Sequence, residues 1–269
     1  MQKKSSCPIC GNEKLKKYNR WKTPSEHRTF VKCAACSHVF AAEFDEAKLN
    51  EFYNSCYYPS PDDPKIQQWI DTNRPIWDDL ADEIISFRKD ITSLLDFGAG
   101  SGGFIESFKA KNCNLAEIHA IENAPAAKEN LIRRFPDGKI HTALDECSRK
   151  NFDCITALQC FEHLDDPLET CFMLHDKTAD NGILIITVPN RFSLRTFLLG
   201  RKDIFNPGNP THLQFFSASS MRKLLTKANF KNIRRMSRFP RCGSFAKRIT
   251  TFICRKLAIS TELRFICRK

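Results

Sequence analysis

Residues 94–103 are Leu-Leu-Asp-Phe-Gly-Ala-Gly-Ser-Gly-Gly, an apolar stretch that ends in an acid and breaks into a glycine-rich turn. Residues 91–97 are short and apolar enough to form a buried parallel strand, and a second apolar stretch, 104–108, follows the turn. Gly98, Gly100 and Gly102 lack a Cβ atom, so the backbone can turn sharply there and a ligand can lie against it. The pattern predicts a strand–loop–helix unit that binds a nucleotide-type cofactor.

The glycine spacing alone does not distinguish between two classes of cofactor. Gly98, Gly100 and Gly103 satisfy the G-x-G-x-x-G pattern of dinucleotide enzymes, and Glu122 follows about twenty residues later. Asp96 favours S-adenosylmethionine over a dinucleotide, because dinucleotide enzymes usually have an apolar residue at this position. A carboxylate there can accept hydrogen bonds from a ligand ammonium group, and S-adenosylmethionine carries such a group.

Residues 96–102, Asp-Phe-Gly-Ala-Gly-Ser-Gly, resemble the first motif, D-x-G-x-G-x-G, of the class I S-adenosylmethionine-dependent methyltransferases. The resemblance implies a Rossmann-like α/β fold with a seven-stranded sheet. It also implies that Asp96 and the glycines of the motif contact the cofactor, and that Glu122 accepts hydrogen bonds from the ribose hydroxyls. Leu144 and Asp145 would flank the adenine ring. From the residues alone, a tight turn that binds no ligand stays open as an alternative.

After this loop, short apolar strands alternate with helices, which predicts a parallel sheet covered on both faces. The expected strands are 91–97, 117–121, 139–142, 152–158, 182–188, 233–237 and an antiparallel strand over 263–268, with a serine-capped helix over 217–228. Ligands of such sheets bind beyond the carboxyl ends of the strands. All the candidate positions fall at that edge.

The segment after the fourth expected strand contains acid and base side chains. Residues 158–164, Leu-Gln-Cys-Phe-Glu-His-Leu, resemble the E-H-L segment of a branch that includes the ubiquinone-biosynthesis O-methyltransferases and many sugar and polyketide methyltransferases. In the ubiquinone enzymes the segment is E-x-x-E-H and can hold a divalent cation. Gln159 replaces the first acid here, which removes one anionic ligand and puts a catalytic metal in doubt. Gln159 is kept as a candidate cofactor contact.

Glu162, His163 and His212 are the candidate catalytic residues. Methyl transfer from a sulfonium is an in-line displacement, so the enzyme aligns the acceptor and, for a hydroxyl, removes a proton. His163 is the natural base because imidazole has a pKa near 6.5. Alternatively, Glu162 and His163 only brace the loop. His212 belongs to an H-x-x-x-[FY]-[ST] segment found in this branch, and it could equally orient the following helix.

Four of the thirteen cysteines have the spacing of a zinc site. Cys7, Cys10, Cys33 and Cys36 form two C-x-x-C pairs, the arrangement of a zinc ribbon with a tetrahedral ion. We expect a zinc ribbon over residues 1–42 with a structural zinc ion, a helical linker or cap over 43–90, and a methyltransferase domain over 91–269. Redox-active cysteines, or cysteines that only pack in the structure, are the alternative to zinc. Contact of the ribbon with substrate or nucleic acid is the alternative to a purely structural role for the zinc ribbon.

The beginning of the chain and its hydropathy predict the compartment. Lysines occur in residues 1–6, but no apolar segment follows them, so no signal peptide is expected. No apolar run is long enough to cross a bilayer. We therefore expect a cytoplasmic protein whose cysteines are reduced or bind metal.

The charge is concentrated at the end of the chain. Residues 191–269 contain 19 lysines and arginines but only Asp203 and Glu262, a net charge of +17 in a chain whose total is +11. Such a patch attracts polyanions or anionic lipid surfaces. Apolar residues at helical spacing over 245–257 predict a basic amphipathic helix that can lie on a membrane. The sequence favours the simpler arrangement, in which the apolar face of this helix packs on the core.

The leading functional hypothesis is methylation of a hydroxyl or a sugar carbon on a small-molecule, glycan or lipid-linked acceptor. An RNA methyltransferase with a zinc ribbon is the first alternative, because a basic surface suits phosphates. The N-P-P-[YF] tetrad of many base-methylating enzymes is absent after the fourth strand, so nucleic acid is the less favoured partner. A noncatalytic, zinc-dependent interaction protein with a degenerate cofactor fold is the second alternative.

Overall fold

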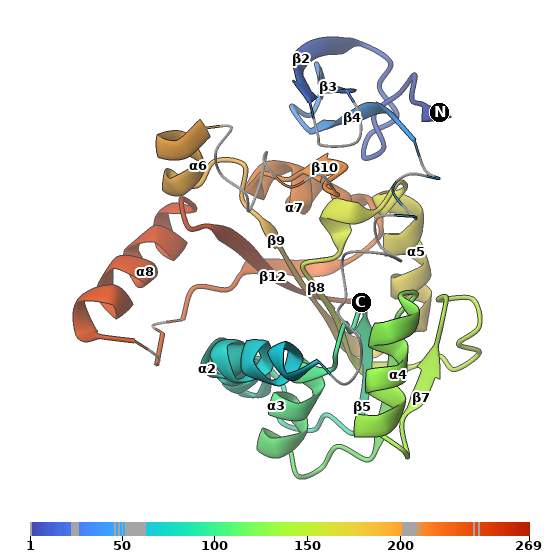
Figure 1. The fold of residues 1–269 in the computed structure, drawn as a ribbon, viewed down its shortest axis with the longest axis vertical. Helices are drawn as coiled ribbons and strands as arrows, with labels where there is room; N and C mark the ends of the chain where they lie inside the picture. Colours follow the sequence, from blue (N-terminus) through green and yellow to red (C-terminus); the bar gives the residue numbers. More distant parts are fainter. Residues whose placement is uncertain are drawn as a thin grey trace.

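A computed structural model shows one large mixed sheet between two layers of helices, with a small antiparallel sheet beside it (Figure 1). The described residues are 2–22, 27–45, 47, 49, 51, 63–200, 209, 211–238, 240–241 and 243–269. Part of the predicted linker, residues 52–62, lies outside them. Among the described residues, no helix combines the length and the apolar composition that crossing a membrane requires.

The large sheet has seven strands, as predicted. They are β5 (Ser93–Phe97), β6 (Glu117–Ile121), β7 (Lys139–His141), β8 (Phe152–Leu158), β9 (Thr178–Pro189), β11 (Lys231–Arg235) and β12 (Glu262–Arg268). Their order across the sheet is β11-β12-β9-β8-β5-β6-β7. β12 pairs antiparallel with both neighbours, and the pairs from β9 to β7 are parallel. The α/β fold with an antiparallel last strand is therefore confirmed, and β9 begins four residues before its predicted start.

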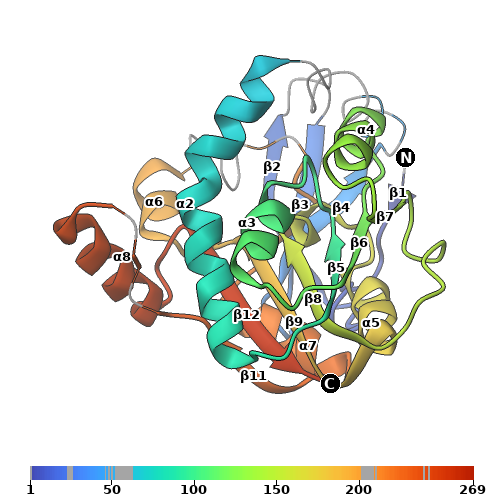
Figure 2. The ribbon, with the colours of Figure 1, turned by 90° about the horizontal axis from the view of Figure 1, so that it is seen from below.

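Helices cover both faces of this sheet (Figures 1 and 2). One layer consists of α2 (Pro64–Phe87), α3 (Gly103–Lys111) and α4 (Pro125–Arg134), and the other of α5 (Pro167–Lys177) and α7 (Ala218–Lys227). Successive residues of a strand point to opposite faces. Leu94 and Cys154 thus belong to one buried cluster, and Leu95 and Ile155 belong to the other. The predicted serine cap at Ser217 is present, because its hydroxyl accepts a hydrogen bond from the Ser220 N–H.

The small sheet contains β1 (Gln2–Lys3), β2 (Leu15–Lys22), β3 (His27–Cys33) and β4 (Val39–Phe44), in the order β1-β4-β3-β2. A short strand from far along the chain, β10 (Gln214–Phe215), pairs antiparallel with β4. Lys4 Nζ lies 2.6 Å from Asp165 Oδ1. Ile9 and Phe40 share a buried cluster with Phe161 and Phe216. The small sheet therefore packs into the same core as the large one.

The helix α8 (Phe245–Leu257) corrects one expectation. Phe245 is 71% exposed and Leu257 is 64% exposed, so the apolar face of α8 points to solvent. The prediction that this face packs on the core is therefore wrong. The buried residue of α8 is Arg255, whose Nη1 lies 3.5 Å from Asp79 Oδ2 of α2. A buried carboxylate requires a partner. Pairing Arg255 with Asp79 turns the apolar side chains of α8 outward.

Candidate functional site

The glycine loop after β5 has the conformation that its sequence predicts. Gly98, Gly100 and Gly102 have φ angles of +75°, +55° and +80°, which side-chain-bearing residues rarely adopt. A Cβ atom on Gly98 would lie 2.8 Å from the Cβ atom of Cys160, which is closer than carbon atoms pack. Backbone conformation and space together require glycine in this loop.

Asp96, at the end of β5, is a buried carboxylate that lacks a cationic partner. It accepts a hydrogen bond of 2.6 Å from the Thr156 hydroxyl of β8. Burial raises the pKa of Asp96 to about 7, the Thr156 hydroxyl lowers it, and the nearby Glu122 raises it further. Within the described part of the chain, no basic side chain forms an ion pair with Asp96. The ammonium group of S-adenosylmethionine would supply the missing positive charge, so this site fits the cofactor.

Glu122, directly after β6, connects two backbone segments at the same edge of the sheet. Its Oε2 accepts a 2.8 Å hydrogen bond from the Gly100 N–H, and its Oε1 accepts one of 2.9 Å from the Ala124 N–H. Burial raises the pKa of Glu122, and these backbone hydrogen bonds lower it. Each carboxylate oxygen has a second lone pair for a ligand hydroxyl. Glu122 is thus fixed beside the glycine loop before any ribose binds.

The remaining predicted cofactor contacts lie in different surroundings. Leu144 is buried and Asp145 is exposed, in the loop between β7 and β8. Gln159 has a φ of +54°, and its amide donates hydrogen bonds of 3.2 Å to Thr187 Oγ1 and to Glu262 Oε2. The side chain of Gln159 is therefore engaged with β9 and β12.

The three candidate catalytic residues come together although they are distant in the chain. Glu162 and His163 lie in the 3-10 turn η2 (Phe161–His163), and the His163 ring meets the His212 ring edge to face at 4.9 Å between centroids. His163 Nε2 lies 3.8 Å from Glu162 Oε1, and the donor atoms of all three residues are within 4.8 Å of one another. The Leu213 N–H donates a 2.7 Å hydrogen bond to the Glu162 carbonyl and joins the two segments.

Burial favours the uncharged form of both members of the Glu162–His163 pair. It lowers the pKa of His163 to about 4 and raises the pKa of Glu162 to about 8. His163 Nδ1 donates a hydrogen bond of 3.2 Å to the Thr211 carbonyl, so the lone pair of the neutral ring is on Nε2. Among the described residues, Glu162 Oε2 has no hydrogen-bond partner. The pair can therefore accept a proton or contribute two ligands to a cation.

Comparison with known proteins agrees with this geometry. A family model described as a methyltransferase domain matches residues 60–235. This chain belongs to that methyltransferase family. The ubiquinone biosynthesis O-methyltransferase of Rickettsia canadensis is 30% identical over 129 residues, which cover 45% of this chain and 53% of that protein. The chain thus matches about half the length of this curated relative.

Solved structures share the fold at low sequence identity. The plantazolicin methyltransferase in complex with SAH has a TM-score of 0.58 at 16% identity, over 83% of this chain and 98% of that one. A SAM-dependent methyltransferase from Archaeoglobus fulgidus has a TM-score of 0.55 at 16% identity, over 73% and 94%. At this identity, the likeness shows the Rossmann-like methyltransferase fold.

Three residues of this methyltransferase fold were not singled out from the sequence. Thr156 holds Asp96, and the thiol of Cys160 donates to the Phe97 carbonyl at 3.3 Å and covers Gly98. Glu262 contacts Gln159 and raises the pKa of Glu162 through its charge. The available signal for Glu262 was that it is one of two acids in a strongly basic segment. No pattern in the sequence pointed to Thr156.

The four cysteines of the two C-x-x-C pairs form one cluster in the small sheet. Cys7 Sγ lies 3.5 Å from Cys36 Sγ, and Cys10 Sγ lies 3.5 Å from Cys33 Sγ. All four sulfur atoms are within 4.8 Å of one another. Ligands about 2.3 Å from a tetrahedral zinc ion are about 3.8 Å apart, so the cluster has the size of a zinc site with four thiolate ligands.

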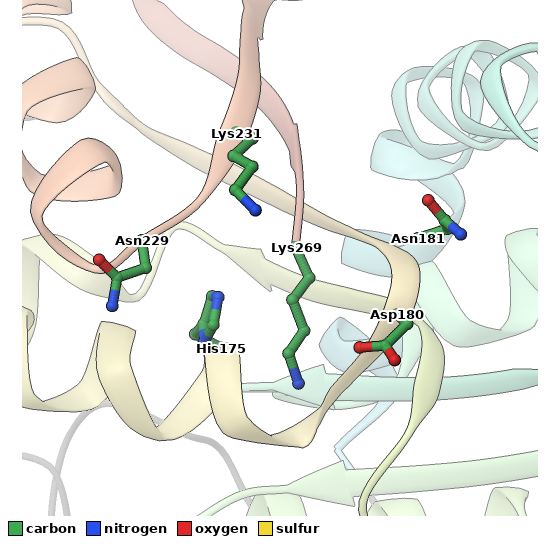
Figure 3. Close-up of a pocket in the computed structure, with 6 residues that line it drawn as sticks. All are labelled: His175, Asp180, Asn181, Asn229, Lys231 and Lys269. Carbon is green, nitrogen blue, oxygen red and sulfur yellow. The ribbon is translucent and has the colours of Figure 1, made fainter.

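A surface pocket lies at the opposite edge of the methyltransferase sheet. His175, Asp180, Asn181, Asn229, Lys231 and Lys269 line it (Figure 3). Asp180 and Asn181 belong to the beginning of β9, whereas the candidate site lies beyond the carboxyl ends of β5, β6 and β8. This pocket is therefore separate from the candidate catalytic residues.

Proposed function

We propose that this protein transfers the methyl group of S-adenosylmethionine to a hydroxyl group of an acceptor, with His163 as the general base. The observation that carries the proposal is the meeting of two groups at one sheet edge. Asp96 and Glu122 surround the glycine loop, Glu162 and His163 follow β8, and His212 meets them from the segment just before β10. Cys160 joins the two groups, because it contacts Gly98 and directly precedes η2.

Each group has a separate task in this reaction. S-adenosylmethionine supplies a methyl group on a positively charged sulfur. Asp96 and Glu122 would hold its ammonium and ribose groups. His163 would remove the acceptor proton at Nε2, because its low pKa keeps the ring neutral and the Thr211 carbonyl fixes the proton on Nδ1. Glu162, whose Oε1 lies 3.8 Å from Nε2, would help to position the ring.

Calorimetric binding and turnover measurements test this proposal. Wild-type protein should bind S-adenosylmethionine and methylate members of a panel of phenols, sugar nucleotides and lipid-linked sugars. His163→Gln should retain binding of S-adenosylmethionine and lose roughly 100-fold or more in kcat. His175→Gln, on α5, is the matched control. The wild-type rate should fall at low pH through a pKa near 4, since protonation of His163 removes the base.

Four outcomes would count against these assignments. Absence of affinity for S-adenosylmethionine would contradict the transferase itself, and full turnover of His163→Gln would contradict the role of the base. Methylation of RNA alone, with steeply salt-dependent binding, would favour the nucleic-acid alternative. Binding without transfer to any acceptor would favour the noncatalytic interaction protein.

An exposed apolar surface supports a lipid-linked acceptor. The helix α6 (Leu194–Leu199) follows β9, which ends at the edge of the candidate site. Phe197 is 84% exposed and Leu198 is 70% exposed. The Leu194 N–H donates a 2.9 Å hydrogen bond to the Ile259 carbonyl just after α8. α6 and α8 therefore lie on the same side of the molecule (Figures 1 and 2), and their apolar side chains are both exposed.

The charge beside this surface favours an anionic membrane as its partner. Lys247 and Lys256 of α8 are exposed, and Arg195 of α6 is partly exposed. Apolar side chains with basic neighbours on short helices are the features of proteins that bind the interface of an anionic bilayer. We propose that α6 and α8 rest on such a surface and bring the catalytic edge to a lipid-linked sugar or a similar acceptor.

Vesicle sedimentation tests the membrane contact. The full chain should bind phosphatidylglycerol vesicles, bind phosphatidylcholine vesicles weakly, and dissociate at high salt. The double variant Phe197→Ser/Phe245→Ser should reduce binding at least tenfold. Ile132→Ser removes an exposed apolar side chain from α4 and should have no effect. Equal binding by the two variants would contradict the assignment of this surface.

We also propose that Cys7, Cys10, Cys33 and Cys36 hold a structural zinc ion. Their spacing in the chain and their closeness in space support this assignment. Cys33→Ser should lower the zinc content by one equivalent, measured by mass spectrometry of the purified protein, and an unchanged content would contradict it. Cys113→Ser, at an exposed cysteine, is the control.

A further inference from the structure

A group of histidine and cysteine side chains lies beside β7, the outermost strand of the large sheet. It is separate from the candidate catalytic residues and from the four-cysteine cluster. His119 is in β6, His141 ends β7, and Cys147 is in the loop that follows. β7 is the edge strand of the sheet (Figure 2). The donor atoms of the three residues are within 4.8 Å of one another. His119 and Cys147 are buried, and His141 is partly exposed.

The distances in this group are close to those around a zinc ion. His119 Nδ1 lies 3.1 Å from His141 Nε2 and 3.3 Å from Cys147 Sγ. Zinc binds nitrogen at about 2.0 Å and sulfur at about 2.3 Å, so tetrahedral ligands are about 3.3 Å apart for two nitrogens and about 3.5 Å for nitrogen and sulfur. The two distances from His119 therefore differ from those around a zinc ion by only a few tenths of an ångström.

Glu117 supplies the outer contact that metal-binding histidines usually have. Its Oε1 accepts a 2.9 Å hydrogen bond from His119 Nε2, which places the proton on Nε2 and the lone pair on Nδ1. Glu117 is held in turn by Arg149, at 2.9 Å, and by Lys139, at 3.2 Å. The lone pair of His119 is thereby aimed at His141 and Cys147.

Hydrogen bonding among these residues satisfies the group poorly. His119 Nδ1 has a single lone pair, yet both His141 Nε2 and Cys147 Sγ approach it within hydrogen-bonding distance. One N–H or S–H can donate to that lone pair, and the Cys147 thiol has the Arg149 carbonyl as a second, longer contact at 3.9 Å from Sγ. A single cation would satisfy all three donor atoms at once.

We propose that His119, His141 and Cys147 bind a zinc ion, with water as the fourth ligand on the partly exposed side of His141. Imidazole and thiolate are ligands that zinc prefers. Binding would release the thiol proton of Cys147 to solvent. Occupancy of this site does not depend on the methyl transfer proposed above.

The position of the site predicts that the ion also affects the binding of S-adenosylmethionine. The His141 carbonyl accepts a 3.0 Å hydrogen bond from the N–H of Glu122, and Cys147 belongs to the loop that carries Leu144 and Asp145. A zinc ion would fix this loop to β6 and β7. Its removal should therefore weaken the binding of S-adenosylmethionine several-fold without abolishing it.

Metal analysis of the full chain tests the proposal. After equilibration with zinc and gel filtration, His141→Gln and Cys147→Ser should each contain one equivalent less than the wild type. Cys171→Ser removes another buried cysteine and should keep the wild-type content. Comparison with the wild type makes the result independent of the zinc held by the four-cysteine cluster.

X-ray absorption at the zinc edge covers the case in which a variant fails to fold. The wild-type spectrum should show imidazole scattering in addition to sulfur, because the four-cysteine cluster contains no histidine. A spectrum with sulfur ligands alone would overturn the proposal. Folded His141→Gln with the wild-type zinc content would overturn it as well.

Discussion

The two halves of the candidate site are built in different ways. In the donor half, Gly100 and Glu122 belong to one β–α–β unit and are joined by a hydrogen bond within it, and Asp96 of the same unit accepts a hydrogen bond from Thr156 of the neighbouring strand β8. In the acceptor half, His163 contacts Thr211, which is 48 residues away, and the following strand β10 pairs with the small cysteine-bearing sheet. The residues of the donor half therefore come from one local unit, whereas the acceptor half depends on the packing of distant segments.

The largest expected effect comes from a substitution that disrupts the donor half alone. Gly98→Val should abolish binding of S-adenosylmethionine, because a side chain at φ +75° would collide with Cys160. Isothermal calorimetry measures the loss, and circular dichroism checks that the variant is folded. Gly200→Ala is the control, since Gly200 also has a positive φ, +53°, but has open space around its Cβ position. Normal binding by Gly98→Val would mean that this loop does not hold the methyl donor.

Disrupting the four-cysteine cluster should affect the acceptor half alone. Cys10→Ser loosens the small sheet, to which β10 is joined directly after His212. Turnover should fall at least tenfold while the affinity for S-adenosylmethionine stays unchanged, as measured by kinetics and calorimetry on the same preparation. Equal losses in the two measurements would show that the halves are not independent.

The buried carboxyl of Glu162 should make stability depend on pH. The pKa of Glu162 is raised from 4.5 to about 8 in the folded protein, so the folded state binds more protons than the unfolded state between these values. This contribution to stability is fully present below about 4.5 and is lost as the pH rises toward about 8. Glu162→Gln should therefore gain in melting temperature relative to the wild type as the pH rises through this range. A difference that does not vary with pH would contradict the raised pKa.

The smallest expected effect concerns the hydrogen bond that holds Asp96. Thr156→Val removes the hydroxyl that lowers the pKa of Asp96, so less of the carboxylate is ionised at neutral pH. Loss of one hydrogen bond of this kind costs about 1 kcal/mol, so affinity for S-adenosylmethionine should fall roughly fivefold. Thr156→Ser keeps the hydroxyl and should bind normally. The loss should diminish at higher pH, where Asp96 ionises in both proteins.

Local patterns in the sequence determined the donor half and the outline of the fold. The acid and glycines at 96–102 require a particular backbone conformation, and alternation of apolar strands with helices leads to a parallel sheet. The two C-x-x-C pairs predicted which four cysteines would meet. In each case the interacting residues are close in the chain, or their spacing is typical of one kind of site.

Tertiary structure alone decided the rest. The gathering of His163 with His212, and of His119 with His141 and Cys147, depends on which strands become neighbours. The orientation of α8 was decided by Arg255, which pairs with the buried Asp79 of α2 and turns the apolar side chains outward. Helical spacing shows that one face is apolar, but the direction of that face depends on charges elsewhere in the fold, which no local pattern records.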